Sequence, residues 1–256
     1  MKINTVNVIC ATFNASNELI KTINSFNNQT YKDKRLIIID GGSNDNFKDV
    51  INIFKKSIDY MVSEPDLGIS DAFNKGIRQA QAGYVYFLGA GDTFFTDDAL
   101  ENLVKDTDYN NDLLVCGKIR RIDLTTNKLL DIAPKSKVFN LSSLLFRMSL
   151  PHQGLLTSTL FFDKYGLFRI DCKYAMDYEL LLRAYHSFPK VIFKDIIVAD
   201  WMSGGVGSGR IREVLREYNR IKEINQVAPK IILIGLNCYT ILKYYIKEWL
   251  DVCKKS

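Results

Sequence analysis

Residues 63–76 read Ser-Glu-Pro-Asp-Leu-Gly-Ile-Ser-Asp-Ala-Phe-Asn-Lys-Gly, and this stretch decides the fold. Gly68 favours a tight turn, and the apolar residues after it recur at helical spacing: Ile69, Ala72, Phe73 and Ile77. Residues 84–88 then form a nearly all-apolar strand, which ends in Gly89-Ala90-Gly91-Asp92. A turn, a helix and a buried strand that ends in a lone carboxylate indicate an α/β fold.

The same alternation extends toward the N-terminus. Short apolar runs predict three more strands, at residues 6–11, 35–39 and 59–62, and amphipathic helical segments separate them. Strands that are apolar throughout and alternate with helices are typical of a mostly parallel sheet with helices on both faces. Ligands bind such sheets beyond the carboxyl ends of the strands. The loops at that rim are rich in Asp, Asn, Gly and Ser, so we expect the functional site there.

The second half of the chain is less regular. Its pattern predicts antiparallel strands over 112–123 and 128–132, a strand over 157–162, and a helix over 174–187. Two separate short strands are expected between residues 191 and 199.

The net charge is +5, and all of this excess lies near the C-terminus. Residues 210–256 carry ten Lys or Arg and five Asp or Glu, whereas residues 1–209 carry 24 of each sign. Within this tail, residues 231–242 form an uncharged run that is too short to span a bilayer but suited to lie in its interface. The tail therefore predicts contact with an anionic surface, and a solvated helical face is an alternative of equal weight. Because the body is neutral, we expect no nucleic-acid partner.

Two carboxylates close apolar strands of the predicted sheet. Asp40 ends the second strand and begins a Gly-Gly-Ser turn, where it can accept hydrogen bonds from the base or ribose of a nucleoside; the alternative is an Asx turn that only shapes the loop. Asp92 follows the fourth strand, and a single carboxylate can hold Mg²⁺ or Mn²⁺ when substrate phosphates supply the other ligands. The alternative for Asp92 is an N-cap of the next helix. Together the two acids predict a site for a phosphorylated, metal-neutralised donor and a group-transfer reaction.

Further candidates lie on the predicted helices and loops. Asp177 begins an otherwise apolar helix, so it is either a catalytic base pointed into a cleft or a partner of the helix dipole. His152, followed by Gln153, is either a ligand or, more often for a lone histidine, a structural residue. Asp71 and Lys75 are four residues apart on one helix, and an ion pair between them is the alternative to a ligand role.

Taken in order, these residues resemble glycosyltransferase family 2, the inverting transferases with the GT-A fold, over roughly residues 5–205. Thr12-Phe13-Asn14 lies where the family has its first nucleotide loop. Asp40-Gly41-Gly42-Ser43-Asn44-Asp45 is similar to the Asp-Asp-Gly-Ser-x-Asp loop of the family, with Gly41 in place of the second Asp. Glu64-Pro65-Asp66-x-Gly68-Ile69-x-Asp71-Ala72-x-Asn74-Lys75-Gly76 is similar to a version common in bacterial transferases that build O-antigen and exopolysaccharide. His152-Gln153 and Ala175-Met176-Asp177-Tyr178 resemble acceptor-side motifs.

The resemblance implies an inverting hexosyltransferase that moves a sugar from a UDP-sugar to a hydroxyl of a lipid-linked or growing saccharide. The product would carry a β-glycosidic bond and belong to a bacterial surface polysaccharide. Asp177 is implied as the catalytic base, Asp92 as the ligand of Mn²⁺ or Mg²⁺, and His152 and Gln153 as residues on the acceptor or donor side. Nucleotide binding is expected from a larger set: Thr12, Asn14, Asp40, Ser43, Asp66, Gly68, Asp71, Asn74 and Lys75.

One departure from the family pattern affects the expected metal. Where the family often has Asp-x-Asp-Asp, this chain has Gly89-Ala90-Gly91-Asp92. Only one carboxylate is left, so metal binding should be weaker or depend more on the diphosphate of the donor.

The resemblance also divides the chain. It implies a GT-A domain over residues 1–209, with a nucleotide-binding half at about 1–95 and an acceptor half at about 96–209, followed by a basic amphipathic helical tail over 210–256. The tail is expected to hold the enzyme beside a polyprenyl-diphosphate acceptor at the inner face of the cell membrane; packing on the domain or a homodimer interface is the competing view. Five scattered cysteines and the absence of a signal-peptide pattern predict a cytoplasmic location. A sugar nucleotidyltransferase and a non-catalytic sugar-nucleotide-binding protein stay open as alternatives.

Overall fold

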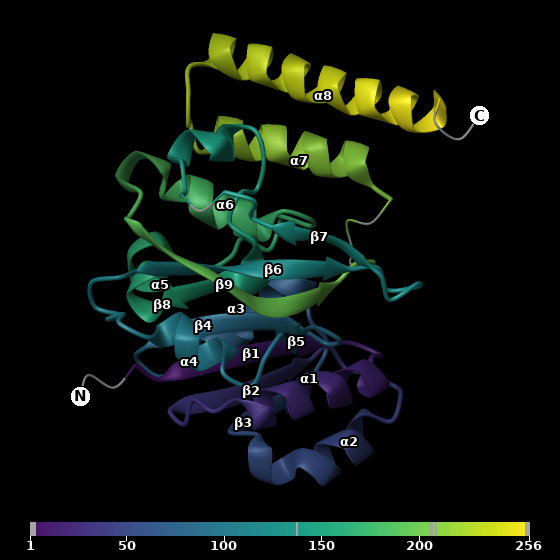
Figure 1. Ribbon diagram of the computed structural model, residues 1–256, viewed down its shortest axis with the longest axis vertical. Helices are drawn as coiled ribbons and strands as arrows, with labels where there is room; N and C mark the ends of the chain where they lie inside the picture. The colour runs from purple at the N-terminus through teal and green to yellow at the C-terminus, as the bar shows by residue number, and fades with distance from the viewer. Residues whose placement is uncertain (1–3, 137, 205–206, 208, 254–256) are drawn as a thin grey trace.

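The computed structural model describes residues 4–136, 138–204, 207 and 209–253 (Figure 1). The elements of the first half are β1 (Val6–Thr12), α1 (Ser16–Asn28), β2 (Lys34–Asp40), α2 (Phe47–Phe54), the 3-10 turn η1 (Lys55–Ser57), β3 (Tyr60–Ser63), α3 (Ile69–Ile77) and β4 (Tyr84–Gly89). Those of the second half are β5 (Thr93–Phe94), α4 (Ala99–Val104), β6 (Leu114–Ile122), β7 (Leu129–Ala133), η2 (Leu141–Leu145), η3 (His152–Gly154), β8 (Leu155–Ser158), α5 (Thr159–Tyr165), α6 (Met176–Arg183), η4 (Tyr185–Ser187), β9 (Val191–Met202), α7 (Ile211–Ile224) and α8 (Lys230–Cys253).

The strands form one sheet in the order β3-β2-β1-β4-β8-β6-β9-β5, with β7 paired to β6. The first four are parallel, which confirms the predicted α/β class for the first half. Beyond β4 the sheet is mixed, since β8 is antiparallel to both β4 and β6, and β6 is parallel to β9. Thr12 lies opposite Asp40, and Ala11 lies opposite Gly89. The carboxyl ends of β1, β2 and β4 therefore meet at one rim.

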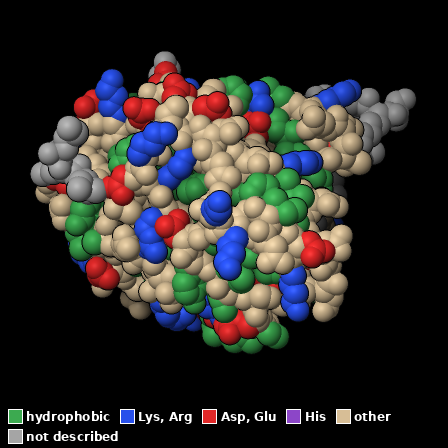
Figure 2. Space-filling model, turned by 90° about the horizontal axis from the view of Figure 1, so that it is seen from below, with side chains coloured by type: hydrophobic (Ala, Val, Ile, Leu, Met, Phe, Trp, Pro, Cys, Tyr) green, Lys and Arg blue, Asp and Glu red, His purple; other side chains and the backbone are tan. Residues whose placement is uncertain are grey.

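The two C-terminal helices stack on the second half of the chain, with α7 over α6 and α8 outermost (Figure 1). Ile221 and Lys222 of α7 are buried, and Leu233 of α8 is 2% exposed. At the opposite end of the molecule, seen from below, positive and negative side chains are interspersed (Figure 2). No helix among the described residues has the length and apolar content needed to cross a bilayer.

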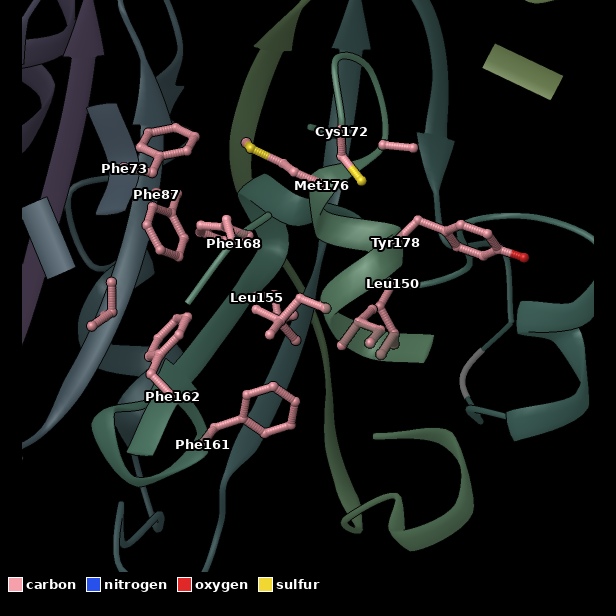
Figure 3. Packing of buried hydrophobic residues seen from close by; sticks show 14 of the residues in the cluster. Phe73, Phe87, Leu150, Leu155, Phe161, Phe162, Phe168, Cys172, Met176 and Tyr178 are labelled. Carbon is pink, nitrogen blue, oxygen red and sulfur yellow. The ribbon is translucent and has the colours of Figure 1, made fainter. Parts of the chain in front are cut away.

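Helices cover both faces of the sheet, and the alternation of side chains along β1 shows why. Val8 and Cys10 join the core formed with α1, α2 and α4, whereas Ile9 and Ala11 join the core formed with α3, α5 and α6. On the second face, Phe73 of α3 and Phe87 of β4 lie 4.7 Å apart between ring centroids. Figure 3 shows Phe168, from the second half of the chain, beside them. This face thus joins the two halves of the chain through one continuous core.

The structure differs from the sequence prediction mainly in the second half. The strand predicted over 157–162 is wrong: β8 ends at Ser158, whose hydroxyl accepts a hydrogen bond from the Leu160 N–H and caps α5. A short apolar run does not distinguish a buried strand from a buried helix. The two strands expected between residues 191 and 199 are one strand, β9, whose register against β6 shifts on both sides of Lys118.

Candidate active site

Asp40 ends β2 at the rim and is fully buried. Its carboxylate accepts hydrogen bonds from the Ser43 N–H (3.0 Å), the Ser43 hydroxyl (2.5 Å) and the Ser63 hydroxyl (2.6 Å). The bond to the Ser43 N–H reaches three residues on, one further than in an Asx turn, but it shapes the loop as that alternative expected. Asp40 therefore shapes the loop after β2 and ties it to β3, and any contact with a nucleoside stays a prediction.

The loop after β1 is tied to the same loop. The Asn14 N–H donates to the Ser43 hydroxyl at 2.7 Å, and the Asn44 N–H donates to Asn14 Oδ1 at 2.9 Å. Asn14 takes a positive φ of 49°, as asparagine tolerates better than most residues. Thr12 is 6% exposed, and its Oγ1 has no hydrogen-bond partner among the described residues. A buried hydroxyl in this state is free to bond a ligand.

Asp66 lies over the glycine that replaces the second acid of the loop. A Cβ placed on Gly41 would come within 2.8 Å of Asp66 Oδ2 and 3.3 Å of the Phe13 ring. The other Asp66 oxygen accepts a hydrogen bond from the Gly68 N–H at 2.9 Å. Phe13 is 61% exposed, so an aromatic face and a carboxylate lie side by side at the rim. The sequence analysis did not single out Phe13, although an exposed aromatic directly after a strand is a usable signal.

The first turns of α3 hold the 64–68 turn in place. Lys75 Nζ lies 2.9 Å from Glu64 Oε1, 3.6 Å from Asp71 Oδ2 and 3.0 Å from the Pro65 carbonyl oxygen. The hydrogen bond to Glu64, followed by the charge of Asp71, raises the pKa of Lys75. The ion pair proposed as the alternative is thus present.

Asn74 contacts the backbone of Phe168, in the second half of the chain, instead of the rim loops. Its amide donates to the Phe168 carbonyl at 2.8 Å, and its Oδ1 accepts from the Phe168 N–H at 2.9 Å. The residue is 4% exposed. Both polar ends of the side chain are therefore already paired, and its predicted contact with a nucleotide stays untested.

Asp92 is 5% exposed and connects three segments. Its oxygens accept hydrogen bonds from the Gly89 and Met202 N–H groups, each at 3.0 Å. Burial raises the pKa of Asp92 to about 7, while these bonds and a hydrogen bond with Gln153 act to lower it. Among the described residues, no group of three or more His, Cys, Asp or Glu side chains could hold a metal ion. The residues present therefore do not form a cation site on their own.

His152 lies within electrostatic reach of Asp177 and packs on the aromatic core. Its ring stacks on Phe87 at 4.7 Å, and its Nε2 is buried without a hydrogen-bond partner in the described part of the chain. Burial lowers the pKa of His152, and the negative charge of Asp177 opposes that effect. The backbone carbonyl of the neighbouring Gln153 accepts a hydrogen bond from the Tyr86 hydroxyl.

Asp177 occupies the first turn of α6 and is half-buried. Its Oδ1 accepts a hydrogen bond from the Tyr178 N–H at 2.8 Å. The side chains before and after it, Met176 and Tyr178, point to opposite sides of the helix (Figure 3). The negative charge of Asp177 acts to raise the pKa of His152 and the pKa of Tyr218 in α7.

Most of the predicted residues fall into two groups. Thr12, Asn14, Asp40, Ser43 and Asp66 form a floor over the ends of β1, β2 and β3. The second group is connected through the 152–153 segment: Asp92, Gln153, His152 and Asp177. Because Gly89 pairs with Ala11 next to Thr12, the two groups adjoin.

Comparison with known proteins gives this arrangement its context. Residues 7–152 match the model of the family described as glycosyl transferase family 2. A PGL/p-HBAD biosynthesis glycosyltransferase of Mycobacterium bovis is 25% identical over 255 residues, which cover 97% of this chain and 92% of that protein.

Solved structures show the same fold. S. aureus TarS 1–349 is 16% identical with a TM-score of 0.66, and the match covers 84% of this chain and 64% of that one. Its complex with UDP-GlcNAc gives 15% identity and a TM-score of 0.68, covering 92% of this chain and 71% of that one. The mannosyltransferase PcManGT from Pyrobaculum calidifontis, in complex with GDP-Man and Mn²⁺, is 16% identical with a TM-score of 0.67, covering 93% and 69%.

The family match spans more than half of the chain, and the Mycobacterium relative, aligned over nearly the full length of both proteins, is named a glycosyltransferase. The structural likenesses confirm the expected GT-A fold with additional C-terminal helices. The chain therefore belongs to glycosyl transferase family 2 and is a glycosyltransferase.

Proposed function

We propose that the protein transfers a hexose from a UDP-sugar to a hydroxyl of a lipid-linked or growing saccharide, with inversion at the anomeric carbon. Family membership supports glycosyl transfer over nucleotidyl transfer or simple sugar-nucleotide binding. The UDP-GlcNAc complex of TarS, a protein with this fold, supports a UDP-sugar as the donor.

The observation that carries the proposal is the position of residues 152 and 153. Gln153 is hydrogen-bonded to Asp92, and His152 lies within electrostatic reach of Asp177. One short segment thus separates a carboxylate at the end of β4 from a carboxylate at the start of α6. A leaving group at the strand end and a base at the helix start would then face one reacting carbon between them.

In the proposed reaction, Asp177 accepts the proton of the acceptor hydroxyl as its oxygen attacks the anomeric carbon. The bond from that carbon to the UDP oxygen breaks, and UDP leaves with the electron pair. Attack from the face opposite UDP converts an α-linked donor into a β-linked product, through an oxocarbenium-like state. His152 is held neutral by burial, so its unpartnered Nε2 can hydrogen-bond a substrate hydroxyl without adding charge.

The nucleoside would occupy the floor over β1 and β2. The Phe13 ring offers a stacking face, the Asp66 carboxylate an acceptor for a base N–H, and Thr12 Oγ1 an unpaired hydroxyl. A divalent ion would neutralise the departing diphosphate, but the described side chains do not hold one alone.

The test of the base is Asp177→Asn, with Asp163→Asn, at an exposed position of α5, as a matched control. We expect Asp177→Asn to lower UDP release from UDP-sugar plus acceptor by about 10²- to 10⁴-fold, with the affinity for UDP nearly unchanged. Asp163→Asn should match the unmodified protein in both measurements. Wild-type turnover by Asp177→Asn would refute the role of Asp177 as the base. Absence of UDP binding by the unmodified protein would refute a UDP-sugar as the donor.

We also propose that α8 holds the enzyme at the inner face of the cell membrane, beside a polyprenyl-diphosphate-linked acceptor. At about 100° per residue, one half of α8 is apolar and exposed: Ile231, Ile232, Ile234, Tyr239, Ile241, Leu242, Tyr245, Ile246 and Trp249. The inner half packs on the body through Leu233. Lys230 and Lys243 are exposed at the two borders of the apolar half. Such a face suits a surface with an apolar interior and anionic head groups.

Flotation with vesicles that contain anionic phospholipid tests this surface. We expect the unmodified protein to float, Leu242→Glu to float at least tenfold less, and the control Ile224→Glu, an exposed apolar residue of α7, to float normally. Failure of the unmodified protein to float would refute the membrane contact. A dimer in solution that Leu242→Glu dissociates would identify the face as a homodimer interface instead.

A further inference from the structure

The loop that leads into α6 is held by a side chain from α7. Ala175, at the N-cap position of α6, makes no side-chain capping bond of its own. Instead the Glu217 carboxylate accepts three backbone hydrogen bonds: from the Lys173 N–H at 3.1 Å, the Tyr174 N–H at 2.9 Å and the Ala175 N–H at 2.8 Å. Charge-assisted bonds to a carboxylate are stronger than neutral ones, so Glu217 fixes three consecutive residues just before Asp177.

The next residue of α7 packs against the turn that carries Asp177. The Tyr218 ring stacks on the Tyr178 ring, with 4.1 Å between centroids and 17° between planes. Burial raises the pKa of Tyr218, and the charge of Asp177 adds to this rise. Tyr218 is therefore a neutral phenol close to the Asp177 carboxylate.

The position of α7 is itself well defined. Arg220 donates to Asp171 Oδ2 at 2.9 Å and to the Asp171 carbonyl at 3.0 Å. Lys222, which is 2% exposed, donates to Asn237 of α8 at 2.5 Å. Contacts on both sides thus keep Glu217 and Tyr218 in register with α6. This helix lies outside residues 7–152, the part that matches the family model.

We propose that Glu217 is a positioning residue for the catalytic base, so that α7 is part of the catalytic unit. The proposal rests on Asp177 as the base. Without the Glu217 carboxylate, three N–H groups lose their common acceptor, and the first turn of α6 is free to shift. A displacement of about 1 Å at a reacting group costs on the order of 100-fold in rate, and the nucleotide floor over β1 and β2 would not be affected.

The experiment compares Glu217→Ala, Glu217→Gln and the control Glu213→Ala, which lies one turn earlier on α7 and is exposed. We expect Glu217→Ala to lower kcat by about 10- to 100-fold with little change in the KM for UDP-sugar or the affinity for UDP. Glu217→Gln keeps an oxygen that can accept from Tyr174 and Ala175, so it should recover most of the rate. Glu213→Ala should behave as the unmodified protein.

The decisive measurement is the double variant Glu217→Ala/Asp177→Asn. If Glu217 acts through Asp177, the double variant retains the same residual rate as Asp177→Asn alone. A further drop equal to that of Glu217→Ala alone would overturn the proposal, as would a normal kcat for Glu217→Ala. If Glu217→Ala does not fold, the kcat of Glu217→Asp, whose carboxylate lies one methylene further from the three N–H groups, is measured in the two backgrounds in its place and decides in the same way. Full activity of Asp177→Asn would instead refute the base assignment.

Discussion

Replacing Asn74 with alanine distinguishes two interpretations of this residue, which lies in the specific motif over residues 64–76. The motif implies a nucleotide ligand, whereas the structure shows both ends of the Asn74 amide bonded to the Phe168 backbone at 2.8 and 2.9 Å. Asn74→Ala leaves the Phe168 N–H and carbonyl without these partners in a buried site. Each unsatisfied group costs about 1–3 kcal/mol, so the expected loss for the two groups is roughly 2–6 kcal/mol of unfolding free energy.

Urea unfolding and UDP titration measure the two effects independently. We expect Asn74→Ala to lower the urea midpoint clearly, while the folded variant binds UDP with nearly unchanged affinity. Asn52→Ala, an exposed asparagine of α2, is the matched control and should retain the wild-type midpoint. A variant with normal stability that has lost UDP affinity would refute this reasoning and return Asn74 to the nucleotide site.

Gly76→Ala should lose about 2 kcal/mol of unfolding free energy, because the added Cβ would lie 2.4 Å from Ile9 Cγ2. Gly235→Ala should gain up to about 1 kcal/mol, because the added Cβ would meet no described atom within 4 Å. Urea unfolding measures both changes. The pKa of Asp92 is about 7 in the folded protein against 3.8 for a free side chain. Between these values the folded state binds more protons than the unfolded state, so the free energy of unfolding should fall as pH rises from about 4 to 7. Asp92→Asn should remove this pH dependence, which unfolding measured across that range checks. Mn²⁺ titrated into the free protein should show no saturable binding, and binding should appear only with UDP present, which calorimetry can check.

The first half of the molecule was predictable because each strand there carries its own signal. The continuous apolar runs and the Asp, Asn and Gly residues after them give the parallel sheet, its rim and the floor around Asp40. In the second half, the antiparallel strands over 112–123 and 128–132 were predicted correctly. The segment 157–162 was not, because its apolar residues fit a strand and a helix equally well and a serine cap decided between them. Glu217 was missed for a different reason. A glutamate on a basic amphipathic helix has the pattern of a solvated residue, and its three backbone partners lie more than 40 residues earlier in the chain.

Helix α7 contacts both the loop before Asp177 and helix α8. Its Glu217 holds the loop before Asp177, and its Lys222 holds Asn237 of α8. The sequence treated residues 210–256 as one tail, with membrane contact and packing on the domain as competing views. The contacts support different roles for the two helices: α7 packs on the body, and α8 presents an apolar half outward. Because α8 packs on α7 and α7 packs on α6, a surface that binds α8 would lie two helices from the base. An acceptor anchored in that surface could then present its hydroxyl to Asp177 while its lipid stays outside the protein.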